Sequence, residues 1–405
     1  MKVAYYSPMP PERSGIADYS ALLVPALRKR LDVEVARHGR QARGDLALYH
    51  LGNNPEAHGW ILEQMRRKPG VVVLHEYVLH HLVAGMTLAR KDVAGYLDAL
   101  ERDAGIAGRL LGLGVVDGCI PPLWEARPDD FPLCDEALDR STGLIVHSHY
   151  VEERVRARGY ARPVWHVPMP AWPVPEVEPA RVDGGPVFGA FGHINTSKRV
   201  PQLLAAFARF RESHADARLL LVGSVSPGLD LDYRIEHEGL GTAVIREDYV
   251  PEERLWSFIR RADAIVSLRA PTMGETSAMV IRALTLGKPL VVSDVGWFRE
   301  LPDDVALKVA PNEHESEQLA AALETLADPA VRESMAVHAQ RLAAREHDLE
   351  HVADLYAAAL EEAAGGDAVR DAVLREVSAV AADVGIDAAS DEAVALGRAL
   401  DEVEL

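Results

Sequence analysis

The sequence predicts an α/β protein with two doubly wound domains, each a mainly parallel sheet with helices on both faces. Short apolar, β-branched runs alternate with helical patterns in two series, the order expected of parallel sheets. A proline-rich stretch separates the series, and 405 residues are more than one ordinary core needs. We expect an N-terminal domain at 1–168, a linker at 169–186, a C-terminal domain at 187–345, and helices with an acidic tail at 346–405.

The first series begins at the N-terminus. Its expected strands are Val3–Tyr6, Val33–Ala36, Leu46–Tyr49, Val71–Leu74 and Leu144–His147. Its expected helices are Ile16–Arg30, Gly59–Arg67, Val93–Leu111 and Val151–Arg156. The segment from Pro168 to Pro186 then interrupts the pattern and reads as an interdomain linker.

The second series repeats the alternation. Its expected strands are Val187–Phe191, Arg218–Val222, Val244–Glu247, Ala264–Leu268, Pro289–Ser293 and Ala306–Val309. Its expected helices are Val200–Ser213, Pro251–Arg260, Thr276–Leu286 and Glu317–Ala327. Doubly wound sheets bind ligands beyond the carboxyl ends of their strands, so the cleft between the halves is the expected site.

The chain continues in Ala- and Glu-rich helices from Val331 to Ala364, where Gly365 breaks the pattern. The acidic, amphipathic remainder fits either a packed helical appendage or a solvated one.

Composition narrows the classes of partner. The net charge of −19 opposes nucleic acid and anionic membrane surfaces. No apolar run is long enough to span a bilayer, and the N-terminus lacks a signal-peptide pattern. The two cysteines, Cys119 and Cys134, are expected to be free thiols in a reducing cytoplasm.

The segment Gly274–Pro289, reading GETSAMVIRALTLGKP, carries the strongest functional signal. A Gly-Glu-Thr-Ser turn that opens a helix offers free backbone N–H groups, two hydroxyls and a carboxylate, a set that can hold a phosphate and sugar hydroxyls. The alternative is an ordinary helix start with Thr276 or Ser277 as its N-cap.

Two loops in the first half also follow strands. Gly15, in the loop from Pro8 to Asp18, lets a ligand approach the backbone at a helix mouth. His75 ends a buried strand and is either a substrate contact or a hydrogen-bonded structural histidine. The spacing of His75, Glu76 and His80 loosely resembles a metal site, but no cysteine or HExxH pattern supports one, so we expect no metal.

In the second half, the loop Gly192–Arg199 follows the first strand and carries Lys198 and Arg199 side by side. Adjacent cations in a loop of an acidic protein suit a diphosphate. Gly223 lies in a similar loop of small residues. The nearby Asp230-Leu231-Asp232 follows a Pro-Gly turn and is interpreted as a solvated turn rather than a metal-binding DxD.

These loops, in this order, resemble retaining glycosyltransferases of the GT-B fold, family 4 (glycosyltransferase group 1), from residue 1 to about residue 350. The matching segments are Ser14-Gly15, His75, the phosphate loop Gly192 to Lys198, Val222-Gly223, Tyr249-Val250-Pro251 and Ala283-Leu284-Thr285-Leu286-Gly287-Lys288-Pro289.

Two positions depart from the family pattern. The second glutamate of the family's E-x7-E motif, which holds the ribose, falls on Arg282, and the first falls on Gly274 with Glu275 one place along. The arginine of the family's phosphate loop falls on His193. Arg199 and Glu275 are candidates to supply the missing charge and the missing sugar contact.

The resemblance implies transfer of a hexose from a nucleoside diphosphate sugar, as co-substrate, to an acceptor of unknown identity, with retention and no further cofactor. It implies catalytic roles for His75, Lys198 and Glu275. Implied donor contacts are Gly15, His193, Lys198, Arg199, Gly223, Val250, Glu275, Thr276, Ser277 and Arg282. Two alternatives stay open: a GT-B sugar epimerase, which needs a carboxylate pair in the cleft, and a sugar-nucleotide-binding pseudo-transferase, which Arg282 favours.

Overall fold

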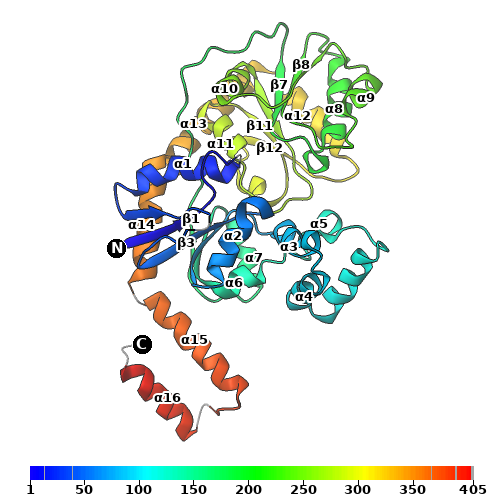
Figure 1. The fold of residues 1–405 in the computed structure, drawn as a ribbon. Helices are drawn as coiled ribbons and strands as arrows, with labels where there is room; N and C mark the ends of the chain where they lie inside the picture. The colour runs from blue at the N-terminus through cyan, green and yellow to red at the C-terminus, as the bar shows by residue number, and fades with distance from the viewer. Residues whose placement is uncertain (13, 39, 366, 388–389, 403–405) are drawn as a thin grey trace.

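The computed structural model describes residues 1–405 except 13, 39, 366, 388–389 and 403–405. Two parallel sheets, each with helices on both faces, form two stacked domains (Figure 1), as predicted. The N-terminal sheet has the order β2-β1-β3-β4-β5-β6 and the C-terminal sheet the order β12-β11-β10-β7-β8-β9. The carboxyl ends of both sets of strands lead into loops that meet between the domains.

The N-terminal domain matches most of the predicted strands. Its strands are β1 (Lys2–Tyr6), β2 (Asp32–Val35), β3 (Leu46–Leu51), β4 (Gly70–Leu74), β5 (Ser141–Val146) and β6 (Val164–His166). Its helices are α1 (Gly15–Leu27), α2 (Pro55–Met65), α3 (His80–Met86), η1 (Leu88–Arg90), α4 (Val93–Val116), α5 (Leu123–Ala126), α6 (Asp135–Arg140) and α7 (His149–Ala157). The short β6 and the helices α3, α5 and α6 were not predicted.

The C-terminal domain agrees more closely with the sequence. Its strands are β7 (Val187–Phe191), β8 (Arg218–Val222), β9 (Val244–Glu247), β10 (Ala264–Ser267), β11 (Leu290–Ser293) and β12 (Ala306–Val309). Its helices are η2 (Thr196–Lys198), α8 (Val200–Arg211), α9 (Leu231–His237), α10 (Glu252–Arg261), α11 (Ala278–Thr285), η3 (Gly296–Glu300), α12 (Glu315–Thr325) and α13 (Pro329–Glu346).

The Asp230-Leu231-Asp232 segment is not the solvated turn expected from the sequence. Asp230 caps α9 by accepting a hydrogen bond from the Tyr233 amide, and Asp232 lies in the first turn and pairs with Arg246. The start of this helix was missed because it follows a Pro-Gly turn, and because the sequence alone does not distinguish an N-cap Asp from an Asp in a loop.

The connection between the domains, residues 167–186, has neither helix nor strand. Met169 and Trp172 are nevertheless buried in the largest apolar cluster, which joins residues of both domains. The linker is therefore packed along most of its length. The domain boundaries at 168, 186 and 345 stay predictions.

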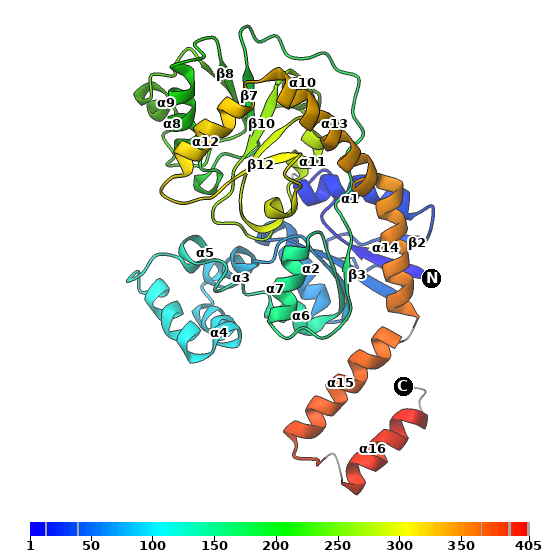
Figure 2. The same cartoon turned by 180° about the vertical axis from the view of Figure 1, so that it is seen from behind.

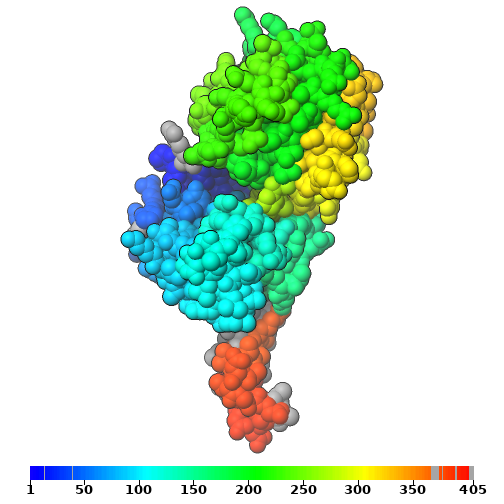
Figure 3. All heavy atoms as spheres, turned by 90° about the vertical axis from the view of Figure 1, so that its right-hand side faces the viewer, coloured from blue at the N-terminus to red at the C-terminus, as the bar shows by residue number. Residues whose placement is uncertain are grey.

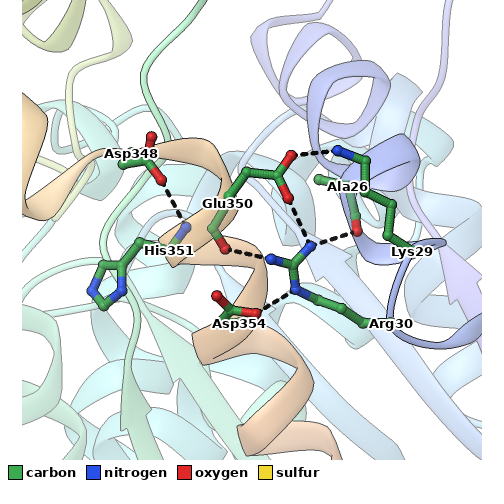
Figure 4. Close-up of polar contacts among 7 residues, drawn as sticks. All are labelled: Ala26, Lys29, Arg30, Asp348, Glu350, His351 and Asp354. Atoms are coloured by element: carbon green, nitrogen blue, oxygen red, sulfur yellow. Dashed lines mark hydrogen bonds and ion pairs between the residues drawn. The ribbon is translucent and has the colours of Figure 1, made fainter.

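After α13, helix α14 (Leu349–Ala364) returns to the N-terminal domain and packs beside α1, as Figure 2 shows from behind. The hydroxyls of Tyr19 and Tyr356 lie 2.6 Å apart in this contact. At its edge, Arg30 binds Glu350 and Asp354, and Lys29 also binds Glu350 (Figure 4). The chain thus ties the second domain to the first twice, through the linker and through α14.

Beyond α14, helices α15 (Asp367–Asp383) and α16 (Asp391–Glu402) form a hairpin that projects from the body (Figure 3). Helix α15 contacts α14 and β5 near its start, whereas Val380 and Val384 farther along are exposed. The tail therefore adjoins the body through α15 and is exposed at Val380 and Val384. Within the described ranges, no helix combines the length and apolar character needed to cross a membrane.

Candidate active site

The two domains meet where the chain leaves β4 and where the GETS loop begins. The Val78 amide donates to the Met273 carbonyl at 3.0 Å. A Cβ on Gly274, whose φ is +80°, would lie 2.6 Å from Cβ of Tyr77. Glu76 and Glu275 adjoin these two contacts, and the charge of Glu275 acts on Glu76.

Glu275 organises its own loop. One carboxylate oxygen accepts hydrogen bonds from the Met273 amide at 2.7 Å and the Thr272 hydroxyl at 3.0 Å. The other lies 2.5 Å from Nε of Arg269, which follows β10. The N–H of that nitrogen is not aligned with the oxygen, so the contact is an ion pair rather than a well-formed hydrogen bond. Glu275 is held in place at the carboxyl edge of the C-terminal sheet.

Glu76 belongs to the same site from the other domain. Its carboxylate accepts a hydrogen bond from the Asn53 amide at 3.0 Å. Burial, and then the charge of Glu275, raise the pKa of Glu76 to about 8. A cavity of about 570 Å³ opens between the domains here. Its lining includes Asn53, Glu56, Glu76, His81, Asn195, Ser197, Arg269 and Glu275.

Lys198 is the cation nearest to this group in the phosphate loop. Its ammonium lies 3.5 Å from the Phe191 carbonyl and beside Gly192, where an added Cβ would be 3.8 Å from Nζ. Burial and then the charge of Arg269 lower the pKa of Lys198 to about 7, while Glu275 opposes the shift. Lys198, Arg269 and Glu275 are thus electrostatically coupled, as a site for a charged ligand requires.

Arg199 turns away from this group. Its guanidinium binds Glu315 at 2.5 Å and 2.9 Å, and Glu315 is only 1% exposed. The backbone of Arg199 is left-handed, with φ of +55°, so the side chains of Lys198 and Arg199 point in different directions. Arg199 anchors the loop to α12, and Arg269 is the second cation near Lys198.

His193 and Gly223 lie on neighbouring loops of the same edge. The two ring nitrogens of His193 each lie 2.9 Å from a serine hydroxyl, on Ser224 and Ser226. Gly223 has φ of +149°, and a Cβ there would be 2.2 Å from the Gly192 carbonyl oxygen. The glycine therefore allows the two loops to touch.

His75 lies in a buried aromatic cluster and is not among the residues lining the cavity. Its Nε2 is 3.0 Å from Nδ1 of His50, and the rings of Tyr19 and His147 are 4.9 Å and 5.0 Å away. Burial and then the neighbouring His147 hold the pKa of His75 well below its ordinary value, so the ring is neutral.

Thr276 and Ser277 are both buried. Ser277 is the N-cap of α11, accepting from the Val280 amide at 3.3 Å. The Thr276 hydroxyl donates to the His147 carbonyl of the other domain at 3.4 Å. Both hydroxyls thus have protein partners, and the helix opens at Ala278, later than the sequence predicts.

Arg282 is 9% exposed and lies one turn into α11. Its guanidinium stacks on Trp172 of the linker at 4.0 Å from the ring centre and lies 3.4 Å from a carboxylate oxygen of Glu252. Asp18 of α1 is close enough for its charge to affect the pKa of Arg282. The position that the sequence analysis aligned with a ribose-binding glutamate therefore holds an arginine whose partners are other side chains of this protein.

Gly15 and Val250 lie farther out. Gly15 is exposed, just after Ser14, whose side chain caps α1, and no atom lies within 4 Å of its added Cβ. Val250 is half-buried, beside Tyr249, which is 73% exposed. Neither residue lines the cavity described above.

Glu76 and Arg269 were not singled out as site residues from the sequence. Each follows the end of a strand, β4 and β10, which is the available signal. No group of three or more potential metal ligands comes together within the described ranges. Cys119 and Cys134 are free thiols, as predicted.

Comparison with known proteins gives a family match in the second half of the chain. Residues 176–341 match the family model "Glycosyl transferases group 1". Alpha-D-kanosaminyltransferase of Streptomyces kanamyceticus is 27% identical over 183 residues, which are 45% of this chain. That match spans about half of the relative, 47% of its length. Both matches fall below what would establish the family for the whole chain, and the family model lies over the linker and the C-terminal domain.

Solved structures resemble the chain over most of its length. Sucrose-phosphate synthase from Thermosynechococcus elongatus has a TM-score of 0.62 at 18% identity, over 89% of this chain and 98% of that one. Anabaena Alr3699/HepE, solved with UDP and glucose, has a TM-score of 0.61 at 15% identity, over 89% and 100%. At such low identity these likenesses establish the fold, which is GT-B.

Proposed function

We propose that this protein is a retaining glycosyltransferase that moves a hexose from a nucleoside diphosphate sugar to an acceptor. The meeting of Arg269 and Glu275 with Glu76 in one interdomain cleft, with Lys198 close enough to interact with Arg269 and Glu275, carries this proposal. The group 1 family match of the C-terminal domain and the UDP in the HepE structure support a UDP-linked donor.

In the proposed reaction, the bond between the anomeric carbon and the diphosphate oxygen breaks. The acceptor oxygen forms its new bond on the same face, and its proton passes to the departing phosphate oxygen. Lys198 and Arg269 stabilise the charge that develops on the diphosphate, and Glu275 orients sugar hydroxyls. The rate enhancement is then electrostatic and positional, without an enzyme nucleophile.

The roles assigned from the sequence shift in detail. Arg269 replaces Arg199 as the second cation, because Glu315 already neutralises Arg199. His75 acts by supporting the segment that carries Glu76, since its ring is packed among Tyr19, His50 and His147. Gly15, His193, Gly223 and Val250 do not line the cavity, and they remain candidate contacts for the nucleotide.

A thermal-shift series with UDP, GDP, ADP and dTDP tests the donor, because ligand binding raises apparent stability by mass action. We expect UDP to give the largest shift. Release of UDP from UDP-glucose, slow in water and faster with acceptor, then tests transfer. Binding without any UDP release would support the pseudo-transferase alternative.

Sugar epimerisation remains the second candidate, because Glu76 and Glu275 provide the carboxylate pair in the cleft that such an enzyme needs. Proton NMR of UDP-glucose incubated with the protein separates the two. An epimerase would yield an inverted hexose still attached to UDP, whereas a transferase would yield free UDP.

A further inference from the structure

Glu76 and Glu275 come from different domains and line one cavity. The hydrogen bond between Val78 and Met273 and the close contact of Tyr77 with Gly274 hold the two segments together beside these residues. The pair is therefore a product of domain contact and not of either domain alone.

The charges around the pair do not balance. Arg269 is committed to Glu275 by the 2.5 Å ion pair. Lys198 lies on the Glu275 side and is weakly charged because burial lowers its pKa to about 7. On the other side stand Glu56, another acid, and His81, whose pKa burial lowers. Among the described residues, the Asn53 amide donates a hydrogen bond to the Glu76 carboxylate.

We propose that Glu76 carries a proton at neutral pH while Glu275 stays paired with Arg269, and that the neutral Glu76 carboxyl donates a hydrogen bond to a sugar or acceptor oxygen in the cleft. Glu76 and Glu275 are each partly buried, and ionising a second carboxylate beside a pair whose cation is already committed is unfavourable. With Glu76 protonated, Arg269 and Glu275 remain a balanced pair. The ligand contact rests on the proposed function, whereas the proton on Glu76 does not.

This assignment turns Glu76 from an acceptor into a donor at neutral pH. A carboxylate there would bind a cationic or hydroxyl donor, but a carboxylic acid can also donate to an oxygen that lacks a hydrogen. Such oxygens in a sugar nucleotide are the ring oxygen, the phosphates and the bridging anomeric oxygen.

The protonation itself is tested on the free protein by NMR. Protein labelled with ¹³C at the glutamate carboxyl is titrated, and the Glu76 signal is identified by its loss in Glu76→Gln. We expect this signal to titrate near pH 8, as the raised pKa indicates. Titration in the ordinary range for glutamate would overturn the protonation of Glu76, whatever reaction the protein catalyses.

The hydrogen-bond role is tested with UDP-glucose, by following UDP release from pH 6 to 9. Glutamine keeps the donor and removes the titration, so Glu76→Gln should stay within about threefold of the wild type at pH 7 and decline less above pH 8. Glu76→Leu should lose about tenfold or more. Glu63→Gln, at an exposed ion pair with Arg90, is the matched control.

A Glu76→Gln protein as inactive as Glu76→Leu would overturn the role, because the ionised carboxylate would then be the working form. Absence of UDP release from the wild type at every pH would reject the proposed transferase instead. The NMR titration would still decide whether Glu76 carries the proton at neutral pH.

Discussion

Gly274 lies so close to Tyr77 that a Cβ on the glycine would come within 3.0 Å of the Tyr77 amide nitrogen. The first residue of the GETS motif is therefore required by contact with the other domain as well as by its own φ of +80°. The sequence suggested a turn that offers its backbone N–H groups to a phosphate. In the structure, Gly274 lies against Tyr77 of the other domain.

Gly274→Ala should weaken the closed arrangement of the two domains. The backbone conformation costs about 1–3 kcal/mol for a residue with a side chain, and the methyl group would also displace Tyr77. Gly228→Ala is a matched control, because Gly228 has φ of +84° with no atom within 4 Å of its added Cβ. We expect UDP-glucose turnover to fall in Gly274→Ala and to persist in Gly228→Ala. Equal effects of the two changes would contradict the contact with Tyr77.

Arg282→Glu should destabilise the protein before it alters donor binding. The change removes the stack on Trp172 and places a third acid near Glu252 and Asp18, at a cost of about 2–4 kcal/mol. Thermal unfolding measures this loss, and Arg282→Lys should keep part of the stability. The exposed pair of Arg246 with Asp232 provides the control Arg246→Glu, expected to cost about 1 kcal/mol or less.

The opposite result, a loss of UDP binding without a loss of stability, would assign Arg282 a role in ligand binding. If Arg282→Glu keeps its melting temperature but loses UDP binding, the arginine is a ligand contact. Higher UDP affinity in the variant would strengthen the pseudo-transferase alternative.

Glu300 of η3 is a latch between the domains. Its carboxylate accepts from the His149 and Tyr150 amides, at 3.1 Å and 2.6 Å, at the N-terminus of α7 in the other domain. Glu300→Ala should leave those amides unpartnered and favour an open form, because a carboxylate there also complements the helix dipole. Small-angle scattering of the ligand-free protein should show a larger radius of gyration than the wild type or the Glu153→Ala control.

Nucleotide sugar should compact the latch variant, if the linker at 168–186 acts as a hinge. A Glu300→Ala protein with the wild-type scattering profile would show that the other interdomain contacts suffice.

The fold followed from local signals, and the site followed from them only in part. Strands such as Val187–Phe191 and Arg218–Val222 are found where the apolar runs place them, because buried parallel strands need continuous apolar sequence. Between β4 and β5, the long helix α4 was predicted, whereas α3, α5 and α6 were missed because they are too short to show a clear helical period. Asp230 was misread because caps and turns use the same residues.

The partners of charged side chains depended on tertiary structure. Lys198 and Arg199 are neighbours in sequence, yet Arg199 itself has a left-handed backbone conformation, and Lys198 interacts with Glu275 whereas Arg199 binds Glu315. Glu76 gained its significance from Glu275, which lies about two hundred residues later in the chain. Pairings at that sequence distance leave no local pattern.

Lys198 should take up a proton when UDP binds above pH 7. Burial, then Arg269, lower its pKa to about 7, so the free protein holds a largely neutral amine at pH 8. A diphosphate favours the ammonium form and raises that pKa, so binding at pH 8 should be accompanied by uptake of up to about one proton. Below pH 6 the lysine is already charged and uptake should vanish. Calorimetry in two buffers of different ionisation enthalpy measures this difference.

The variant Lys198→Met should abolish the buffer dependence and weaken binding in the transition state by about 2–4 kcal/mol, because a charge-assisted contact to the diphosphate is lost. The fold should persist, since methionine suits a desolvated position. Lys29→Met, which removes an exposed lysine paired with Glu350, should change neither quantity. Full UDP affinity and turnover in a folded Lys198→Met protein would remove Lys198 from the site, and with it the electrostatic basis of the proposed transfer.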